Sequence, residues 1–440
     1  MRRNAVVVGY WKTIKYSVHV LLGAAEEHRL HKDVDFYLVS IDDVLSTINE
    51  LRTKYSKIMY MQTLLTTDLL SKHKKLVEIN KKLRDLGIVS IAGGPHATGD
   101  PFGTVISLGF RYAFLGDVED LLPQVVELGF NYRDPSSVIG IFYVDDSGKF
   151  VFRGRGFTKE LDKYPPFSPK LNLFSPIEIT RGCRYSCNFC QVSYIHTATT
   201  RHRSIENIVF WCRYLLNRGI RDLRFITPDA LSYEDPKTNQ DFIELLSELS
   251  KLRSEGGKIY FGTFPSEIRP EKINQEVSRF LKTHVDNKRV NIGAQTGSDE
   301  LLKKIRRGHT SEDVLNALEA LSNVGLSAEV DYIIGLPDET LEDQQLTIEH
   351  MKKVISKDGR IRIHYFIPLP GTPYALRNPS AIPTRFRREL MRLVGSGKAR
   401  GNWLNQENAV RELLRLRDEG VILLTSDRAR NVLLGSLRKA

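Results

Sequence analysis

The 440-residue sequence has few cysteines, no long apolar run and no acidic excess. Four cysteines in so long a chain argue against a disulfide-stabilised secreted fold. No run approaches the roughly 18–20 apolar residues that a membrane-spanning helix requires. The N-terminus reads Met-Arg-Arg-Asn and then only four apolar residues, too short for the apolar part of a secretory signal. We therefore expect a cytoplasmic protein without a membrane span.

The composition that remains is that of a globular protein. Hydrophobic residues make up 41% and charged residues 27%, which excludes disorder over most of the chain. The 64 basic and 53 acidic residues leave a net charge of +11. Residues 376–440 contain 14 basic and 6 acidic residues, a net charge of +8. A positive field attracts anions, so we expect an anionic substrate or partner at this region. Nucleic-acid binding and an ordinary solvated helix surface are the alternatives.

Residues 1–130 alternate short apolar runs with helical spacing. Strands are predicted at 5–9, 36–39, 57–61, 89–92 and 112–115, with helices at 16–30, 42–54 and 76–86 and a helix start at Thr66–Asp68. This alternation predicts an α/β fold with a doubly wound parallel sheet, whose ligands bind beyond the carboxyl ends of the strands. Gly93, Gly94 and Gly116 fall there, where close approach to a ligand requires the absence of a Cβ. The alternative is that they only form tight turns.

The remaining chain divides into three further segments. Residues 131–172 contain a hairpin signal, 139–144 and 149–153 around Asp-Asp-Ser-Gly, and then a proline-rich connector. Residues 173–375 repeat strand–helix units, with helices predicted at 205–217, 240–253, 274–283, 311–324 and 341–356. Such repeats predict a partial barrel with reactive groups at the carboxyl ends of its strands. Residues 376–440 predict a small helical region at 384–393, 406–417 and 428–437, which we expect to cover the open side of the barrel.

Three of the four cysteines, Cys183, Cys187 and Cys190, lie within eight positions, directly after a predicted strand. Zinc sites usually take four ligands in paired clusters, and no second cluster of cysteines follows. Three thiolates can instead hold a four-iron cluster in which one iron lacks a protein ligand, whereas four cysteines are usual. That open iron can chelate a small molecule and pass it an electron. A structural metal site completed by His196 or Cys212, or three buried cysteines, are the alternatives.

With Phe189 before its last cysteine, this spacing resembles the signature of the radical SAM superfamily. The resemblance implies that Cys183, Cys187 and Cys190 hold a 4Fe-4S cluster. It also implies that the open iron binds S-adenosylmethionine and that one electron cleaves it to a 5′-deoxyadenosyl radical. A reductant similar to ferredoxin or flavodoxin is the implied partner.

Later segments also resemble the family, and they follow the cysteines in the same order as the successive strands of its barrel. They are 223–229, 260–270, 290–298, 331–339 and 364–373. The resemblance implies that S-adenosylmethionine contacts Phe189, Asp229, Ser266, Glu267, Arg269 and Gln295. Gln295 departs from the family, since glutamate is usual there. Helix capping and local turns are the alternative roles for these side chains. Tyr185, Tyr194 and His196 follow as candidates for lining the pocket or for packing.

The N-terminal segment resembles the cobalamin-binding domain that is fused to one class of these enzymes. The similarity rests on Gly-Gly-Pro-His at 93–96 and Gly-Asp-x-Glu at 116–119. It implies cobalamin contacts from Gly93, Gly94, Pro95, His96 and Gly116. The Asp-x-His-x-x-Gly motif that supplies a histidine to cobalt in other cobalamin proteins is absent. The resemblance thus implies a cobalt without a protein histidine beneath it, and His19 and His28 are expected to be surface or packing residues.

The combined resemblance implies cobalamin-dependent methylation of an unactivated carbon. One alternative keeps the radical chemistry without methyl transfer, in carbon–carbon bond formation, cyclisation or lipid modification. A second is a methylthiotransferase acting on transfer RNA or a ribosomal protein, which would need three further cysteines for a second cluster. A third is an iron–sulfur redox sensor or nucleic-acid-binding protein. The sequence leaves a small-molecule, lipid or protein substrate open.

Overall fold

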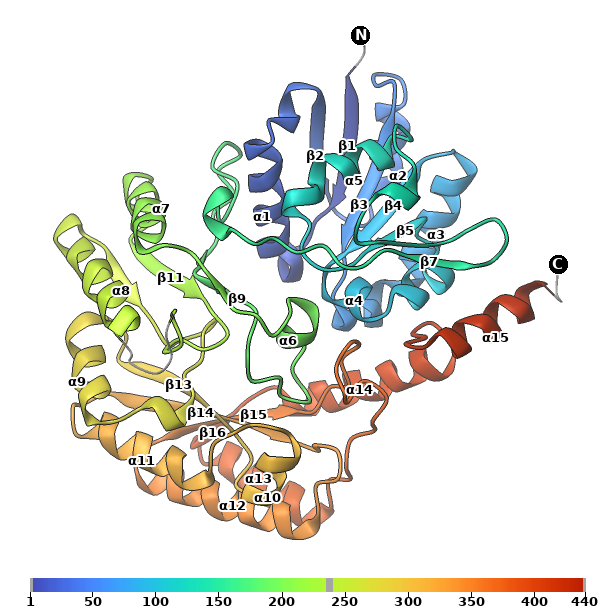
Figure 1. The fold of residues 1–440 in the computed structure, drawn as a ribbon. Coiled ribbons are helices and arrows are strands. Elements are labelled where there is room, and N and C mark those ends of the chain that lie inside the picture. The colour runs from blue at the N-terminus through green and yellow to red at the C-terminus, as the bar shows by residue number, and fades with distance from the viewer. Residues whose placement is uncertain (1–2, 235–239, 438–440) are drawn as a thin grey trace.

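The computed structural model describes residues 3–234 and 240–437. Two α/β units lie side by side, the N-terminal one blue to cyan and the second green to orange (Figure 1). The last helices, in red, run from the second unit to the first. No helix in these described ranges is long and apolar enough to cross a membrane.

The N-terminal unit is built on a seven-stranded sheet in the order β2-β1-β3-β4-β5-β6-β7. Pairing is parallel as far as β5 and antiparallel between β5, β6 and β7. The hairpin predicted within 131–172 is therefore present, and it extends this sheet. The strands are β1 (Asn4–Gly9), β2 (Val34–Val39), β3 (Ile58–Thr63), β4 (Val89–Gly93), β5 (Tyr112–Phe114), β6 (Ile141–Val144) and β7 (Phe150–Phe152).

Helices cover both faces of this sheet, which explains why β1 is apolar and buried from Ala5 onward. One core contains side chains of α1 (Lys15–Glu27) and α5 (Leu122–Gly129). The other contains those of α2 (Val44–Leu51) and α3 (Leu69–Asp85). The predicted doubly wound sheet is thus confirmed. The order of strands reverses between β1 and β3, where such sheets form a crevice for ligands.

The second unit is a partial barrel of six parallel strands, as predicted. Two sheets, β12-β11-β8 and β13-β14-β15, are joined by an isolated bridge between Ile268 and Ile292, while a bridge between Thr227 and Ser266 prolongs the pairing of β11 with β12. The barrel strands are β8 (Ile177–Glu178), β11 (Asp222–Ile226), β12 (Lys258–Tyr260), β13 (Arg289–Gln295), β14 (Ser327–Ile334) and β15 (Arg360–Tyr365). The short β9 (Thr180–Arg181) and β10 (Arg201–His202) pair beside them.

The helices of this unit alternate with its strands, and most of them share one large apolar core, whereas Leu301 and Leu302 pack into a smaller one with Phe366. Thr310 and Asp313 form a capping box on α11, and Thr340 and Asp343 form another on α12. The helices are α6 (Val192–Ile195), α7 (Ile205–Asn217), α8 (Gln240–Lys251), α9 (Gln275–His284), α10 (Asp299–Lys304), α11 (Ser311–Ser322) and α12 (Leu341–Ser356).

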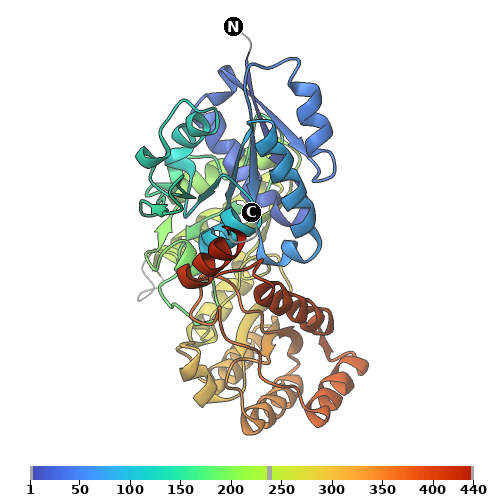
Figure 2. The same cartoon turned by 90° about the vertical axis from the view of Figure 1, so that its right-hand side faces the viewer.

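The C-terminal region joins the two units. It contains α13 (Thr384–Gly395), β16 (Ala399–Arg400), α14 (Trp403–Asp418) and α15 (Ser426–Leu437). β16 extends the open edge of the barrel by pairing with β15. Trp403 is buried in the barrel core, whereas Leu413 and Leu416 of the same helix pack into the core of the first unit. Figure 2 shows α15 lying against the first unit.

Candidate functional site

The three clustered cysteines lie in the loop between β9 and α6 and line one cavity of about 420 Å³. The cavity opens at the carboxyl ends of the barrel strands, where barrel enzymes place their reactive groups. Gly182 begins the loop with a φ of 84°, and a Cβ there would lie 2.3 Å from the carbonyl oxygen of Thr199. The sequence therefore needs glycine at this position to turn the three thiols into the cavity.

Neither proposed fourth ligand reaches these cysteines. Cys212 is completely buried in the apolar core beneath α7. His196 lines a different cavity, and its Nδ1 lies 2.7 Å from an Asp117 oxygen. Within residues 3–234 and 240–437, no three His, Cys, Asp or Glu side chains converge on a point suited to one metal ion. Three thiols around a wide cavity therefore fit a multi-iron cluster with an open iron better than a zinc site.

Most of the side chains predicted to contact S-adenosylmethionine line this same cavity. Ser266 differs, because its hydroxyl points away and donates to the Thr263 carbonyl at 3.0 Å. Its neighbours in the chain, Pro265 and Glu267, still line the cavity. The lining residues from the prediction are Phe189, Asp229, Glu267, Arg269 and Gln295.

Asp229 and Arg269 each keep one buried polar atom without a protein partner. One Asp229 oxygen pairs with Lys272 at 3.2 Å, but Oδ1 has no partner in the described part of the chain. The same holds for Nη1 of Arg269, whose guanidinium lies 3.6 Å from the centre of the Tyr185 ring. Buried polar atoms rarely stay unsatisfied. One open carboxylate oxygen and one open guanidinium N–H fit a ligand that carries both an ammonium and a carboxylate group.

Sequence reasoning named Glu267 but missed Arg307 and Asp331, two further charged groups that line the cavity. Nη2 of Arg307 donates to the Gly293 carbonyl at 2.9 Å, while Nη1 lies 3.9 Å from the sulfur of Cys187. Asp331 accepts from Nε of Arg362 at 2.6 Å. Burial, together with the charge of Asp331, raises the pKa of Glu267 to about 7. Arg307 lies in a segment already compared with the family, but nothing local marks it as pointing at a cysteine.

A second cavity, of about 470 Å³, lies at the carboxyl edge of the N-terminal sheet. Its wall includes the predicted Gly93, Gly94, Pro95 and Gly116. A Cβ at Gly116 would lie 2.3 Å from the Gly156 carbonyl oxygen, so this glycine also serves local packing. His96 does not line the cavity, because it is completely buried with Nδ1 3.1 Å from the Thr66 hydroxyl.

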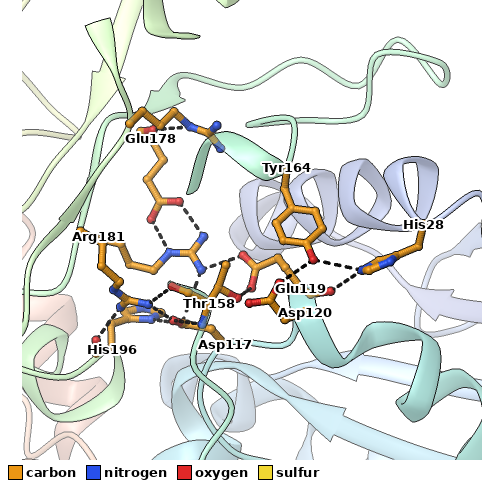
Figure 3. Close-up of polar contacts among 11 residues, drawn as sticks. His28, Asp117, Glu119, Asp120, Thr158, Tyr164, Glu178, Arg181 and His196 are labelled. Atoms are coloured by element: carbon orange, nitrogen blue, oxygen red, sulfur yellow. Dashed lines mark hydrogen bonds and ion pairs between the residues drawn. The ribbon is translucent and has the colours of Figure 1, made fainter. Parts of the chain in front are cut away.

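A buried network of charges joins the two units beside this cavity (Figure 3). Arg181 of the barrel contacts Glu178 and Glu119 at 2.7 Å each and Asp117 at 3.5 Å. Arg201 and His196 also contact Asp117. Burial alone would raise the pKa of Asp117, but the hydrogen bond from His196 and the two arginines hold it well below its usual value. The Asp117 carboxylate is therefore ionised throughout the physiological range.

The two cavities are neighbours. Phe264 and Pro265, in the loop after β12, line both of them. The side chain of Phe264 is 68% exposed, since it stands at this boundary rather than in a core. A molecule lying against Phe264 therefore has access to both cavities.

Of the remaining candidates, one lines the cysteine cavity and the others are held by hydrogen bonds to neighbouring residues. Tyr185 lines the cysteine cavity, whereas the Tyr194 hydroxyl donates to the Ser186 carbonyl at 2.9 Å. His19 is buried between the hydroxyls of Tyr10 and Ser175, as expected for a packing residue. His28 contacts the Glu119 carbonyl at 2.7 Å.

The basic C-terminal region reaches the cysteine cavity through a neutral side chain. Gln406 of α14 lines the cavity and accepts a hydrogen bond from the Tyr365 amide at 2.9 Å. Several arginines of the region pair with carboxylates of the barrel, for example Arg377 with Asp338 at 2.5 Å and Arg400 with Glu329. These ion pairs partly neutralise the positive charge of the region.

Comparison with known proteins identifies the second unit. Residues 177–351 match the family model described as the radical SAM superfamily. These residues form a radical SAM domain. An uncharacterized protein of Methanopyrus kandleri is 25% identical over 341 residues, 66% of this chain and 63% of that protein. The tRNA-2-methylthio-N(6)-dimethylallyladenosine synthase of Prosthecochloris aestuarii is 29% identical over 219 residues, 49% of this chain and 47% of the synthase. The chain spans less than two thirds of the length of these curated relatives.

Solved structures share the arrangement of the radical SAM domain behind an N-terminal unit. The radical S-adenosylmethionine methyltransferase TsrM from Kitasatospora setae, solved with cobalamin and a 4Fe-4S cluster, superposes with a TM-score of 0.65 at 18% identity. That match covers 85% of this chain and 77% of TsrM. The cobalamin-dependent radical enzyme OxsB gives a TM-score of 0.65 at 16% identity, covering 93% of this chain and 56% of OxsB. At such identities the likeness establishes the fold.

Proposed function

We propose that this protein is a cobalamin-dependent radical SAM methyltransferase that acts on an unactivated carbon. The observation that carries the proposal is the pair of neighbouring cavities, one lined by three cysteines and the other by the glycine-rich edge of the N-terminal sheet. TsrM and OxsB, which share the fold, are described with cobalamin bound. The substrate's reacting carbon would lie at the Phe264 boundary, within reach of both cofactors.

The residues of the cysteine cavity suit a 4Fe-4S cluster and S-adenosylmethionine. The three thiols would hold the cluster, and the open polar atoms of Asp229 and Arg269 would bind the amino-acid end of the second molecule. Together with cobalamin, these groups supply one-electron cleavage of S-adenosylmethionine and a transferable methyl group. The chain's own task is to position the reacting molecules and exclude water.

The test begins with anaerobic purification and reconstitution with iron and sulfide. Addition of S-adenosylmethionine and a low-potential reductant should yield 5′-deoxyadenosine, and titration with hydroxocobalamin should show saturable micromolar binding. Methylation is then read as a mass gain on candidate metabolites, lipids and proteins from the host. Iron-free protein after reconstitution would refute the radical SAM assignment. Cleavage without cobalamin binding would favour radical chemistry without methyl transfer.

A second candidate function is methylthiolation of transfer RNA, favoured by the similarity to curated synthases of that activity. The described cysteines outside the loop amount to Cys212 alone, which lies buried in the barrel core. Mass spectrometry of host transfer RNA after deletion of the gene separates the two activities. Loss of a methylthio group would support this second function.

The proposed setting is the cytoplasm, where thiols stay reduced and a ferredoxin or flavodoxin can supply the electron.

A further inference from the structure

A further cavity, of about 550 Å³, lies at the amino edge of the N-terminal sheet, opposite the glycine-rich edge. Its wall contains the residues that lead into β4 and β5, the last residue of β6, and Val432 and Leu433 of α15. We infer that this cavity is a binding site for a nucleoside monophosphate. The inference goes beyond the proposed function and does not depend on it.

Two arginines of this wall carry positive charge without a counter-ion. Arg84, in the last turn of α3, donates from Nη2 to the Gly109 carbonyl at 3.2 Å. The guanidinium of Arg111 lies over the ring of Tyr112. Among the residues that the structure describes, neither arginine forms an ion pair, and none that lines the cavity is acidic. Two unpaired guanidinium groups suit a phosphate, which each of them can bind through parallel N–H groups.

Asn80 adds a buried hydrogen-bond acceptor to the same wall. Its Nδ2 donates to the Leu108 carbonyl at 2.8 Å, which fixes the orientation of the amide group. Its Oδ1 is buried and has no partner in the described part of the chain. An amide oxygen can only accept, and leaving it unsatisfied in the interior costs free energy. The ligand that completes this site therefore carries an N–H or O–H donor in addition to its anionic group.

The rest of the wall is mostly apolar, with Phe110 before β5, Val144 at the end of β6 and Val432 of α15 among its side chains. The ligand thus joins three features, namely an anionic group, a hydrogen-bond donor and a body of low polarity. A nucleoside monophosphate has all three, in its phosphate, the N–H groups of its base and the faces of the base ring. The cavity volume also lies within the range of about 300–1,000 Å³ that is usual for small-molecule sites.

The far end of the chain completes this site, because α15 lies against the first unit (Figure 2). The turn before α15 is already held there, since the Leu423 amide donates to Asp100 at 2.9 Å. A nucleotide in the cavity would contact both α15 and the segment 105–111 that leads into β5. Its binding should therefore slow hydrogen exchange in these two segments.

The test is calorimetric titration of the full-length, reconstituted protein with adenosine monophosphate (AMP). We expect saturable binding, and binding about tenfold weaker in Arg84→Gln and in Arg111→Gln, because each loses a charged donor. Purine riboside monophosphate lacks the amino group of AMP, so it should bind the parent protein about fivefold more weakly. This difference should disappear in Asn80→Leu. Where that variant does not fold, the comparison of the two nucleotides in the parent protein decides the role of Asn80.

Arg29→Gln is the matched control, because Arg29 is an exposed arginine of the same unit that follows α1, on the other face of the sheet from α3. AMP should bind this variant as it binds the parent protein. No binding at about 1 mM AMP would overturn the inference, and so would equal affinity in the parent protein and both cavity variants. Displacement of AMP by S-adenosylmethionine would also overturn it, since AMP would then lie in the cysteine cavity. Each of these outcomes leaves the proposed function standing.

Discussion

At the scale of single residues, Cys187 and Cys212 are both buried thiols in opposite settings. Cys187 faces the cavity with Nη1 of Arg307 at 3.9 Å, whereas Cys212 is enclosed by apolar side chains beneath α7. Burial among apolar side chains raises the pKa of the Cys212 thiol, which disfavours the thiolate that a metal would need there. The two thiols therefore differ in what their loss would do.

We expect Cys187→Ala to lose most of its iron after anaerobic reconstitution, because two thiols cannot hold the cluster stably. Cys212→Ala is the matched control, and it should retain iron and lose about 1 kcal/mol of folding stability. Iron and sulfide analysis and the visible absorption of the cluster check both variants. Equal iron content in the two variants would contradict the assignment of the cysteine loop.

His19 makes stability depend on pH. Burial lowers the pKa of this histidine to about 4, while in the unfolded chain it stays near its usual 6.5. Below pH 6.5 the unfolded state therefore binds more protons, so folding stability is lost as the pH falls from about 6.5 towards 4. The decrease in the free energy of unfolding should be on the order of 3 kcal/mol at most.

Urea denaturation at pH 7 and pH 5 measures this loss. In His19→Gln, which can still bond Tyr10 or Ser175, the decrease in stability between the two pH values should be smaller. An unchanged decrease would show that other groups dominate the acid response.

At the scale of elements, the sequence predicts most helices and strands because apolar periodicity follows burial. The helices predicted at 205–217 and 341–356 have the observed bounds of α7 and α12. The helix start predicted at Thr66–Asp68 is confirmed, since α3 begins at Leu69. α14 begins at Trp403 rather than at residue 406, because Trp403 is anchored in a core formed with distant segments. Local spacing does not record such contacts.

The same reasoning explains which site residues could be predicted. Contiguous motifs predicted the three cysteines and most of the side chains at the strand ends that line the same cavity. The pairing of Arg181 with Glu119 and of His196 with Asp117 joins segments from the two units. A single sequence carries no signal for such pairings between distant segments. Ser266 and His96 show what a motif leaves open, since a motif position fixes the backbone but not where the side chain points.

Asp100 ties the turn before α15 to the first unit. It is completely buried, and its carboxylate accepts the amides of Gly103 at 3.0 Å and of Leu423 and Leu424 at 2.9 Å. Asp100→Ala leaves these amides unsatisfied, so it should cost about 3 kcal/mol of stability. Hydrogen exchange should accelerate at Leu423 and Leu424 while β3 stays protected.

Asp134→Ala is the control for that experiment, because Asp134 caps an exposed turn through the amide of Ser136 at 2.7 Å. It should cost about 1 kcal/mol or less. Similar exchange at Leu423 in both variants would show that Asp100 does not hold this segment.

At the scale of the whole molecule, Arg181 links the two units by contacting Asp117 and Glu119 of the first unit, and it also pairs with Glu178 of its own unit. Removing one member of a buried charged group leaves the others uncompensated, so Arg181→Met should cost about 3–5 kcal/mol in the free energy of unfolding. Arg213→Gln provides the comparison, since its pair with Glu255 at 2.9 Å is on the surface. That variant should change stability by about 1 kcal/mol or less. Chemical denaturation measures both, and equal effects would contradict a linking role for Arg181.

The order of the chain has a consequence for synthesis on the ribosome. Both cavity walls are formed largely by residues that precede 370, whereas the amides that Asp100 receives belong to residues 423 and 424. The nascent protein thus carries most of the walls of both cavities before the segment that Asp100 anchors has been translated. Until the last helices are made, the two units lack this additional fastening, and a large cofactor would meet a less firmly closed protein.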